Sequence, residues 1–67
     1  MLQHIKYYIK IGEKMVEVRR ENIPADVRKS LQSYEILQVS KSKVTVALYG
    51  DEEDPLILLE VPRNMLA

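Results

Sequence analysis

No cysteine occurs in this chain of 67 residues, and His4 is its only histidine. A domain of this size buries only about 60% of the surface that its unfolded chain exposes, so its stability is marginal unless something reinforces it. The composition excludes disulfide bonds and the usual Cys/His zinc sites as that reinforcement. We therefore expect one domain over residues 1–67, stabilised by unusually good packing or by self-association.

The first element expected is a hairpin. Residues 5–11 alternate with a period of two, as a half-buried strand does, and Gly12-Glu13 offers a two-residue turn with glycine at the position of positive φ. Closing the chain there aligns apolar partners on one face, namely Ile9 with Val16 and Tyr7 with Val18. The other face then pairs mostly polar side chains, in the combinations Tyr8 with Glu17, Lys10 with Met15 and Lys6 with Arg19.

A helix of about three turns is predicted over residues 22–34. Pro24 suits the first helical position, and Asp26 favours the positive end of the helix dipole. Val27, Leu31 and Tyr34 follow at the spacing of one helical face. We expect this apolar stripe to pack on a sheet, because so short a helix does not persist alone.

The C-terminal half predicts a three-stranded meander over 35–40, 43–49 and 56–61, with turns at 41–42 and 50–55. The expected pairs are Val39 with Val44, Leu37 with Val46, Leu48 with Ile57, Val46 with Leu59 and Val44 with Val61. One face of the meander is then wholly apolar, and one helix is enough to cover it. The predicted fold is a small ββαβββ domain of the α+β class, with an antiparallel sheet and one short helix.

The opposite face of this meander is also rich in apolar residues, although an antiparallel sheet with one face in water should be polar there. Its apolar positions are Ile36, Ala47, Tyr49, Leu56 and Leu58, interrupted by Gln38, Thr45 and Glu60. An apolar patch of this kind on a small domain indicates an interface, and we expect a homodimer. The alternative is that the N-terminal hairpin or the Met65-Leu66 tail covers the patch within one chain.

The sequence offers no catalytic, metal or cofactor site. Nucleophilic catalysis needs an activated nucleophile beside an oriented base, and His4 has neither a cysteine nor a second histidine to act with. The acidic run Asp51–Asp54 lacks the alternating ligand spacing of a calcium loop, and is typical of a solvated turn. We expect a protein that is not an enzyme. With no leader-like stretch and no apolar run approaching roughly 18 residues, we also expect it to be cytoplasmic and to have no membrane contact.

Charge is balanced overall, with ten basic and ten acidic side chains, but unevenly placed. Residues 1–34 carry seven Lys/Arg and four Asp/Glu, whereas residues 35–67 carry three and six. The asymmetry is compatible with a phosphate-binding end, with head-to-tail association, or with two solvated faces. Lys6, Lys10 and Arg19 are expected on the outer face of the hairpin beside Tyr8, where they would contact phosphate or serve as solubilising charges.

Residues 23–31, Ile-Pro-Ala-Asp-Val-Arg-Lys-Ser-Leu, resemble the I-P-x-x-[LV]-R-[RK]-x-L segment of AbrB-like swapped-hairpin DNA-binding domains. That family includes transition-state regulators and many antitoxins. The resemblance implies an obligate dimer with interlocked strands, in which basic residues near the helix and the hairpin contact DNA. Arg28 and Lys29 match the paired basic residues of the family's motif.

Two functional hypotheses follow. The first is a small homodimeric transcriptional regulator or antitoxin that binds double-stranded DNA through Arg19, Arg20, Arg28 and Lys29. The second is a protein-binding module, an inhibitor or accessory factor, that presents the apolar face of the meander to a partner. Salt dependence separates them, because binding through several phosphates weakens steeply as salt rises.

Overall fold

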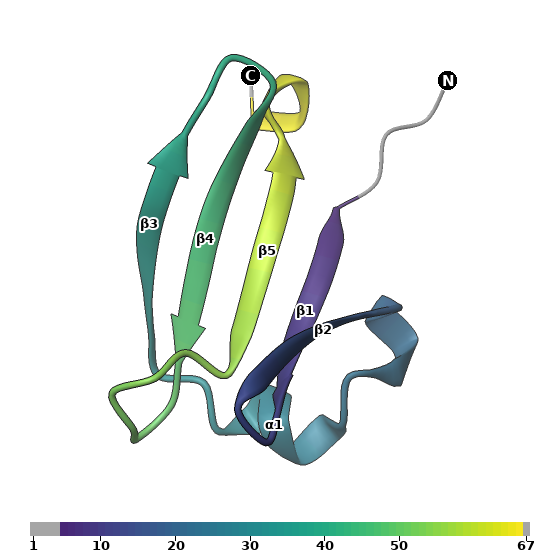
Figure 1. Ribbon diagram of the computed structural model, residues 1–67, viewed down its shortest axis with the longest axis vertical. Coiled ribbons are helices and arrows are strands. Elements are labelled where there is room, and N and C mark those ends of the chain that lie inside the picture. Colours follow the sequence, from purple (N-terminus) through teal and green to yellow (C-terminus); the bar gives the residue numbers. More distant parts are fainter. Residues whose placement is uncertain (1–4, 67) are drawn as a thin grey trace.

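The computed structural model describes residues 5–66, which form one five-stranded antiparallel sheet (Figure 1). Along the sheet the strands lie in the order β2-β1-β5-β4-β3. Their bounds are β1 (Lys6–Ile11), β2 (Lys14–Val18), β3 (Ser33–Val39), β4 (Lys43–Tyr49) and β5 (Ile57–Pro62). The 3-10 turn η1 (Arg20–Asn22) and the helix α1 (Ala25–Lys29) connect β2 to β3, and the 3-10 turn η2 (Arg63–Leu66) follows β5. The α+β class and the ββαβββ order are confirmed.

The β1–β2 hairpin has the predicted register. Tyr7 pairs with Val18 and Ile9 with Val16, around a turn in which Gly12 has φ +63°. Since β2 ends at Val18, the predicted pair of Lys6 with Arg19 does not form. Lys6 is aligned instead with Glu60 on the other side of β1.

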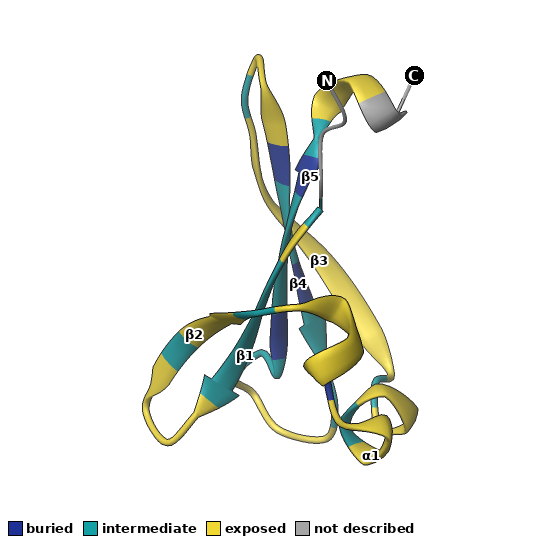
Figure 2. Ribbon diagram, turned by 90° about the vertical axis from the view of Figure 1, so that its right-hand side faces the viewer, coloured by how far each residue is buried: buried dark blue, intermediate teal, exposed yellow. Residues whose placement is uncertain are grey.

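The hairpin joins the meander through β1 and β5, which are far apart in the sequence. Their register places Tyr7 beside Leu59 and Ile9 beside Ile57 on one face of the sheet. This face is called the helix-side face, because η1 and α1 lie on it. The sheet is strongly twisted, and Figure 2 shows the hairpin projecting to one side and the η1–α1 segment to the other. The helical segment reaches only one end of the sheet.

The meander has the predicted pairs except at one point. Val39 with Val44, Leu48 with Ile57, Val46 with Leu59 and Val44 with Val61 all form. Val46 faces Ile36 rather than the predicted Leu37, because a register shift between Ile36 and Gln38 makes Leu37 an extra residue in β3. The shift is a β-bulge, which reverses the alternation of side chains on one side of it.

This bulge changes which face β3 presents. Ile36 lies opposite Val46 and Tyr34 lies opposite Leu48, so both are on the helix-side face together with Val39. The prediction that Ile36 shares a face with Ala47 and Leu58 is therefore wrong. The residue that shares their row is Glu35, which pairs with Ala47.

The helix is much shorter than predicted, with five residues instead of about three turns. At the end of the helix, the Ser30 hydroxyl donates a hydrogen bond to the Val27 carbonyl (2.8 Å). Two residues later, the backbone N–H of Gln32 donates to the Tyr49 carbonyl of β4 (2.7 Å). From Gln32 onward the backbone therefore forms hydrogen bonds with the sheet instead of continuing the helix, and Tyr34 belongs to β3. The predicted stripe keeps Val27 and Leu31, which are half-buried, but loses Tyr34.

The core is small because so short a helix cannot cover a five-stranded sheet. The buried apolar residues of the described chain are Ile23, Val44, Ala47, Ile57 and Val61. Ile57, at the centre of the sheet between β1 and β4, is 2% exposed. Residues 5–66 contain no helix long and apolar enough to cross a membrane.

Candidate interaction surfaces

The outer strand β3 is the most exposed element of the sheet. All seven of its residues are exposed, as the yellow strand in Figure 2 shows. Its large apolar side chains are between 50 and 70% exposed, and they are Tyr34, Ile36, Leu37 and Val39. Leu37 and Val39 were predicted to lie under the helix, which does not reach them. An exposed edge strand with apolar side chains is a template for pairing with another strand.

The opposite edge of the sheet is β2, whose exposed side chains are mostly charged. In β2 the exposed side chains include Lys14 and Glu17, and the strand continues into Arg19 and Arg20. Charged side chains on an edge strand discourage pairing with a further strand. Val16 is the one exposed large apolar residue of β2, at 40%.

The only charged residue of β3, Glu35, forms a hydrogen bond with the neighbouring strand of the sheet. Glu35 accepts a hydrogen bond from the Tyr49 hydroxyl of β4 (2.9 Å). This bond is the chief reason that the pKa of Tyr49 is raised above 10.0, because it favours the protonated phenol. The Glu35 carboxylate therefore points toward β4, away from the outer edge of β3.

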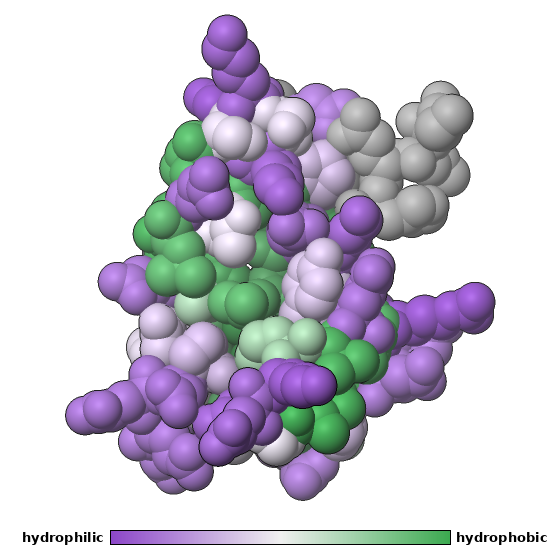
Figure 3. Space-filling model, viewed as in Figure 1, coloured by the Kyte–Doolittle hydropathy of each residue, from purple (hydrophilic) through white to green (hydrophobic). Residues whose placement is uncertain are grey.

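The face opposite α1 carries four of the five residues that the sequence predicts for an interface, and their role there remains a prediction. Ala47 is fully buried in the single chain, and Tyr49, Leu56 and Leu58 are half-buried. Figure 3 shows apolar surface across the middle of this side of the molecule, bordered by hydrophilic side chains. Of the five predicted interface residues, Ile36 is the most exposed, at 55%, and it lies on the other face.

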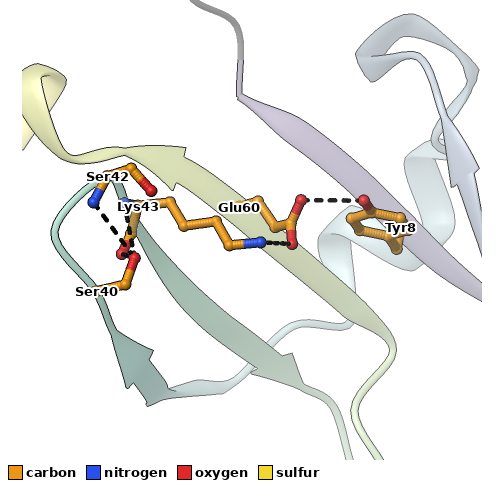
Figure 4. Close-up of polar contacts among 5 residues, drawn as sticks. All are labelled: Tyr8, Ser40, Ser42, Lys43 and Glu60. Carbon is orange, nitrogen blue, oxygen red and sulfur yellow. Dashed lines mark hydrogen bonds and ion pairs between the residues drawn. The ribbon is translucent and has the colours of Figure 1, made fainter.

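A chain of polar contacts crosses that opposite face (Figure 4). Glu60 on β5 accepts from the Tyr8 hydroxyl of β1 (3.0 Å) and from the Lys43 ammonium of β4 (2.7 Å). The hydrogen bond from Lys43 is the chief cause that lowers the pKa of Glu60, whereas the carboxylate raises the pKa of Tyr8. The three side chains link three adjacent strands, which is a structural role.

The basic residues proposed for nucleic-acid contact lie in and beside η1 and α1. Arg19, Arg20, Arg28 and Lys29 are all exposed, and none forms an ion pair with a described residue. The two lysines of β1 are less available for contact with a nucleic acid, because each lies near a carboxylate. Lys10 forms an ion pair with Asp54 (3.3 Å), and Lys6 is aligned with Glu60.

Two of these arginines share an open hollow on the helix-side face. Its volume is about 230 Å³, and it is lined by Tyr7, Arg20, Ile23, Arg28, Leu31, Leu48, Ile57 and Leu59. Ile23 is buried here because η1 and α1 hold the intervening segment against the sheet. The apolar lining comes from three strands and from the connection, and the two arginines belong to η1 and α1.

The acidic residues do not form a metal site in the described part of the chain, where no three potential ligands gather. Asp51 accepts a hydrogen bond from Gln32 and Asp54 pairs with Lys10, so the acidic loop is tied to its neighbours at both ends. His4 lies outside the described residues.

Comparisons with protein-family models, with curated proteins and with solved structures found no match to this chain. The resemblance of residues 23–31 to AbrB-like domains remains a prediction.

Proposed function

We propose that this protein is a non-enzymatic interaction module that forms a homodimer by pairing β3 with β3 of a second copy. The observation that carries the proposal is that every residue of β3 is exposed, with four large apolar side chains at an edge that has no outward charge. A second strand placed there would satisfy the free backbone groups of the edge and cover those side chains.

A second copy fits this edge better than an unrelated strand does. An antiparallel strand pair has a two-fold axis, so a single exposed strand is complementary to itself and needs no second matching surface. Tyr34, Ile36 and Val39 share one face of the sheet, and across the two-fold axis this apolar row would pack against the same row of the second copy. The only charge, Glu35, is held by Tyr49 and stays clear of the new pairing.

The small core also supports self-association. Five buried apolar residues are few for an independent fold, and neither a disulfide nor a zinc site compensates. A second copy of the chain is always available as a partner, and dimerisation would bury additional apolar surface that the single chain leaves exposed.

Sedimentation equilibrium tests the proposal with a matched pair of variants. Ile36→Lys places a charge on the exposed face of β3, and Val16→Lys places the same charge on the exposed face of β2. We expect the parent and Val16→Lys to have twice the 7.8 kDa chain mass, and Ile36→Lys to shift toward the monomer. Far-ultraviolet circular dichroism checks that the variant retains its strands.

A monomeric parent at all concentrations would overturn the homodimer. If a monomeric parent gained mass only with another protein, and Ile36→Lys abolished that gain, β3 would instead be the binding strand for a different partner.

Double-stranded DNA is the second candidate ligand, favoured by the four exposed basic residues of the η1–α1 segment that have no described ion-pair partner. Phosphate contacts make the logarithm of the affinity fall linearly with the logarithm of the salt concentration, by about 0.9 per contact. Fluorescence anisotropy with a mixed duplex should give such a slope, which Arg28→Gln and Lys29→Gln would each reduce by about one. Binding that is absent at low salt, or insensitive to salt, would refute this function.

A further inference from the structure

The hollow between the η1–α1 segment and the sheet is lined by apolar side chains and by two arginines. Tyr7, Leu48, Ile57 and Leu59 of the sheet line it together with Ile23 and Leu31 of the connection, and Arg20 and Arg28 complete the lining. We propose that this hollow binds a small organic phosphate, a phosphate monoester with a short aromatic or aliphatic body.

The two arginines provide the recognition of the phosphate group. Both are exposed, and neither forms an ion pair with a described residue, although Glu21 adjoins Arg20 and Asp26 lies two positions before Arg28. A guanidinium group presents several donors in a planar fork that matches phosphate oxygens. Two of them match the charge of a phosphate monoester, which is close to −2 at neutral pH. The Tyr7 hydroxyl makes no hydrogen bond to another described residue, and it adds a donor to the same lining.

The apolar lining provides the recognition of the organic body. Five of the lining residues are Ile or Leu, and Ile23 and Ile57 among them are buried, so this lining is held in place by the core. A volume of about 230 Å³ equals roughly seven or eight liquid water molecules of about 30 Å³ each. A single aromatic ring or a short alkyl chain fits within such a space, and its burial adds affinity that inorganic phosphate lacks.

This combination distinguishes the ligand from duplex DNA. The backbone of a duplex offers phosphates without an apolar group that enters a hollow, so it would use the cations and leave the apolar lining uncovered. Arg19 and Lys29, which do not line the hollow, would serve duplex DNA as well as Arg20 and Arg28 do.

The test is a titration of the full chain with phenyl phosphate, followed by the backbone amide resonances of a nitrogen-15 labelled sample. We expect shifts around Ile57, Leu59 and Leu31, and weaker binding of inorganic phosphate and of phenol, each of which has only half of the recognised chemistry. Arg28→Gln should weaken the binding of phenyl phosphate by about tenfold or more, the value of a charged hydrogen bond. Lys29→Gln, the neighbouring cation that does not line the hollow, should leave it nearly unchanged.

Three outcomes would overturn the proposal. They are the absence of shifts around the hollow, equal affinity for inorganic phosphate and phenyl phosphate, and equal effects of Arg28→Gln and Lys29→Gln. A duplex whose binding is weakened by Arg28→Gln, in a protein that shows no shifts with phenyl phosphate, would instead assign the arginines to DNA. The inference does not depend on the homodimer, because Arg28→Gln leaves β3 untouched and the mass of the variant in solution reports on that separately.

Discussion

Replacing Ile57 by alanine tests whether the centre of the sheet is the centre of the core. Ile57 is 2% exposed and is held between Ile9 of β1 and Leu48 of β4. The change removes three carbon atoms, and at about 0.8 kcal/mol for each buried methylene the transfer term is about 2.4 kcal/mol. The open hollow beside Ile57 lets the surroundings and water fill part of the space, so the additional cavity term should be small.

We therefore expect Ile57→Ala to lower the free energy of unfolding by about 2.5 to 3 kcal/mol, near the low end of the usual range for such substitutions. For 67 residues the total stability should be roughly 3 to 10 kcal/mol, so the loss is a large part of it. Urea denaturation followed by circular dichroism measures the change, at one fixed chain concentration because association contributes to stability.

The matched control is Ile11→Ala, the same chemical change at the exposed end of β1. Ile11 is 54% exposed, so its replacement should cost about 1 kcal/mol or less. If the two variants were equally destabilised, or if Ile57→Ala cost less than about 1 kcal/mol, the core would not be where the sheet register places it.

Three further predictions concern the loops and the polar chain of the sheet. Because the folded state lowers the pKa of Glu60, its ionised form stabilises the fold above the ordinary value of 4.5, and this stability is lost as the pH falls through the lowered pKa. Glu60→Gln should flatten that acid limb of the stability profile; an unchanged limb would refute the role of the carboxylate. Tyr8 has a raised pKa, so the stability that it contributes persists through pH 10.0 and is lost above it, and Tyr8→Phe should remove this alkaline loss from a thermal-melting profile. Gly12→Ala should cost about 1 to 2 kcal/mol, because φ is +63° while no atom lies within 4 Å of the added Cβ, whereas Gly12→Asn should cost less; equal urea midpoints would contradict this.

Sequence reasoning succeeded where the structure depends on neighbouring residues. The β1–β2 register follows from alternation on both sides of Gly12-Glu13, and the β4–β5 register follows from apolar pairs across the acidic turn. The β-bulge at Leu37 left no mark in the pattern, because Ile36 and Leu37 are both apolar and either suits the place opposite Val46. One unrecognised bulge was enough to put Ile36 on the wrong face.

The helix prediction failed for a tertiary reason. The spacing of Val27, Leu31 and Tyr34 fits a helical face, but Tyr34 also fits a strand, and pairing with Leu48 decides in favour of the strand. The pairing of β1 with β5 joins distant segments, so the sequence could not show that β3 becomes an edge. The sequence named Arg20 and Arg28 as candidate ligands for phosphate, which remains a prediction, whereas the hollow beside them depends on where Ile23 packs.

The pairing of β3 with β3 of a second copy is tested most directly by cysteine cross-linking, since the chain has no cysteine of its own. Single cysteines would be placed in turn along Ser33–Val39, with Glu17→Cys on β2 as the control. Facing residues of antiparallel strands have Cα atoms about 4.5 to 5.5 Å apart, within the reach of a disulfide. We predict rapid disulfide formation near one position of β3, where a residue meets its own equivalent across the two-fold axis. If no β3 cysteine cross-links faster than the control, the edge-to-edge dimer is contradicted.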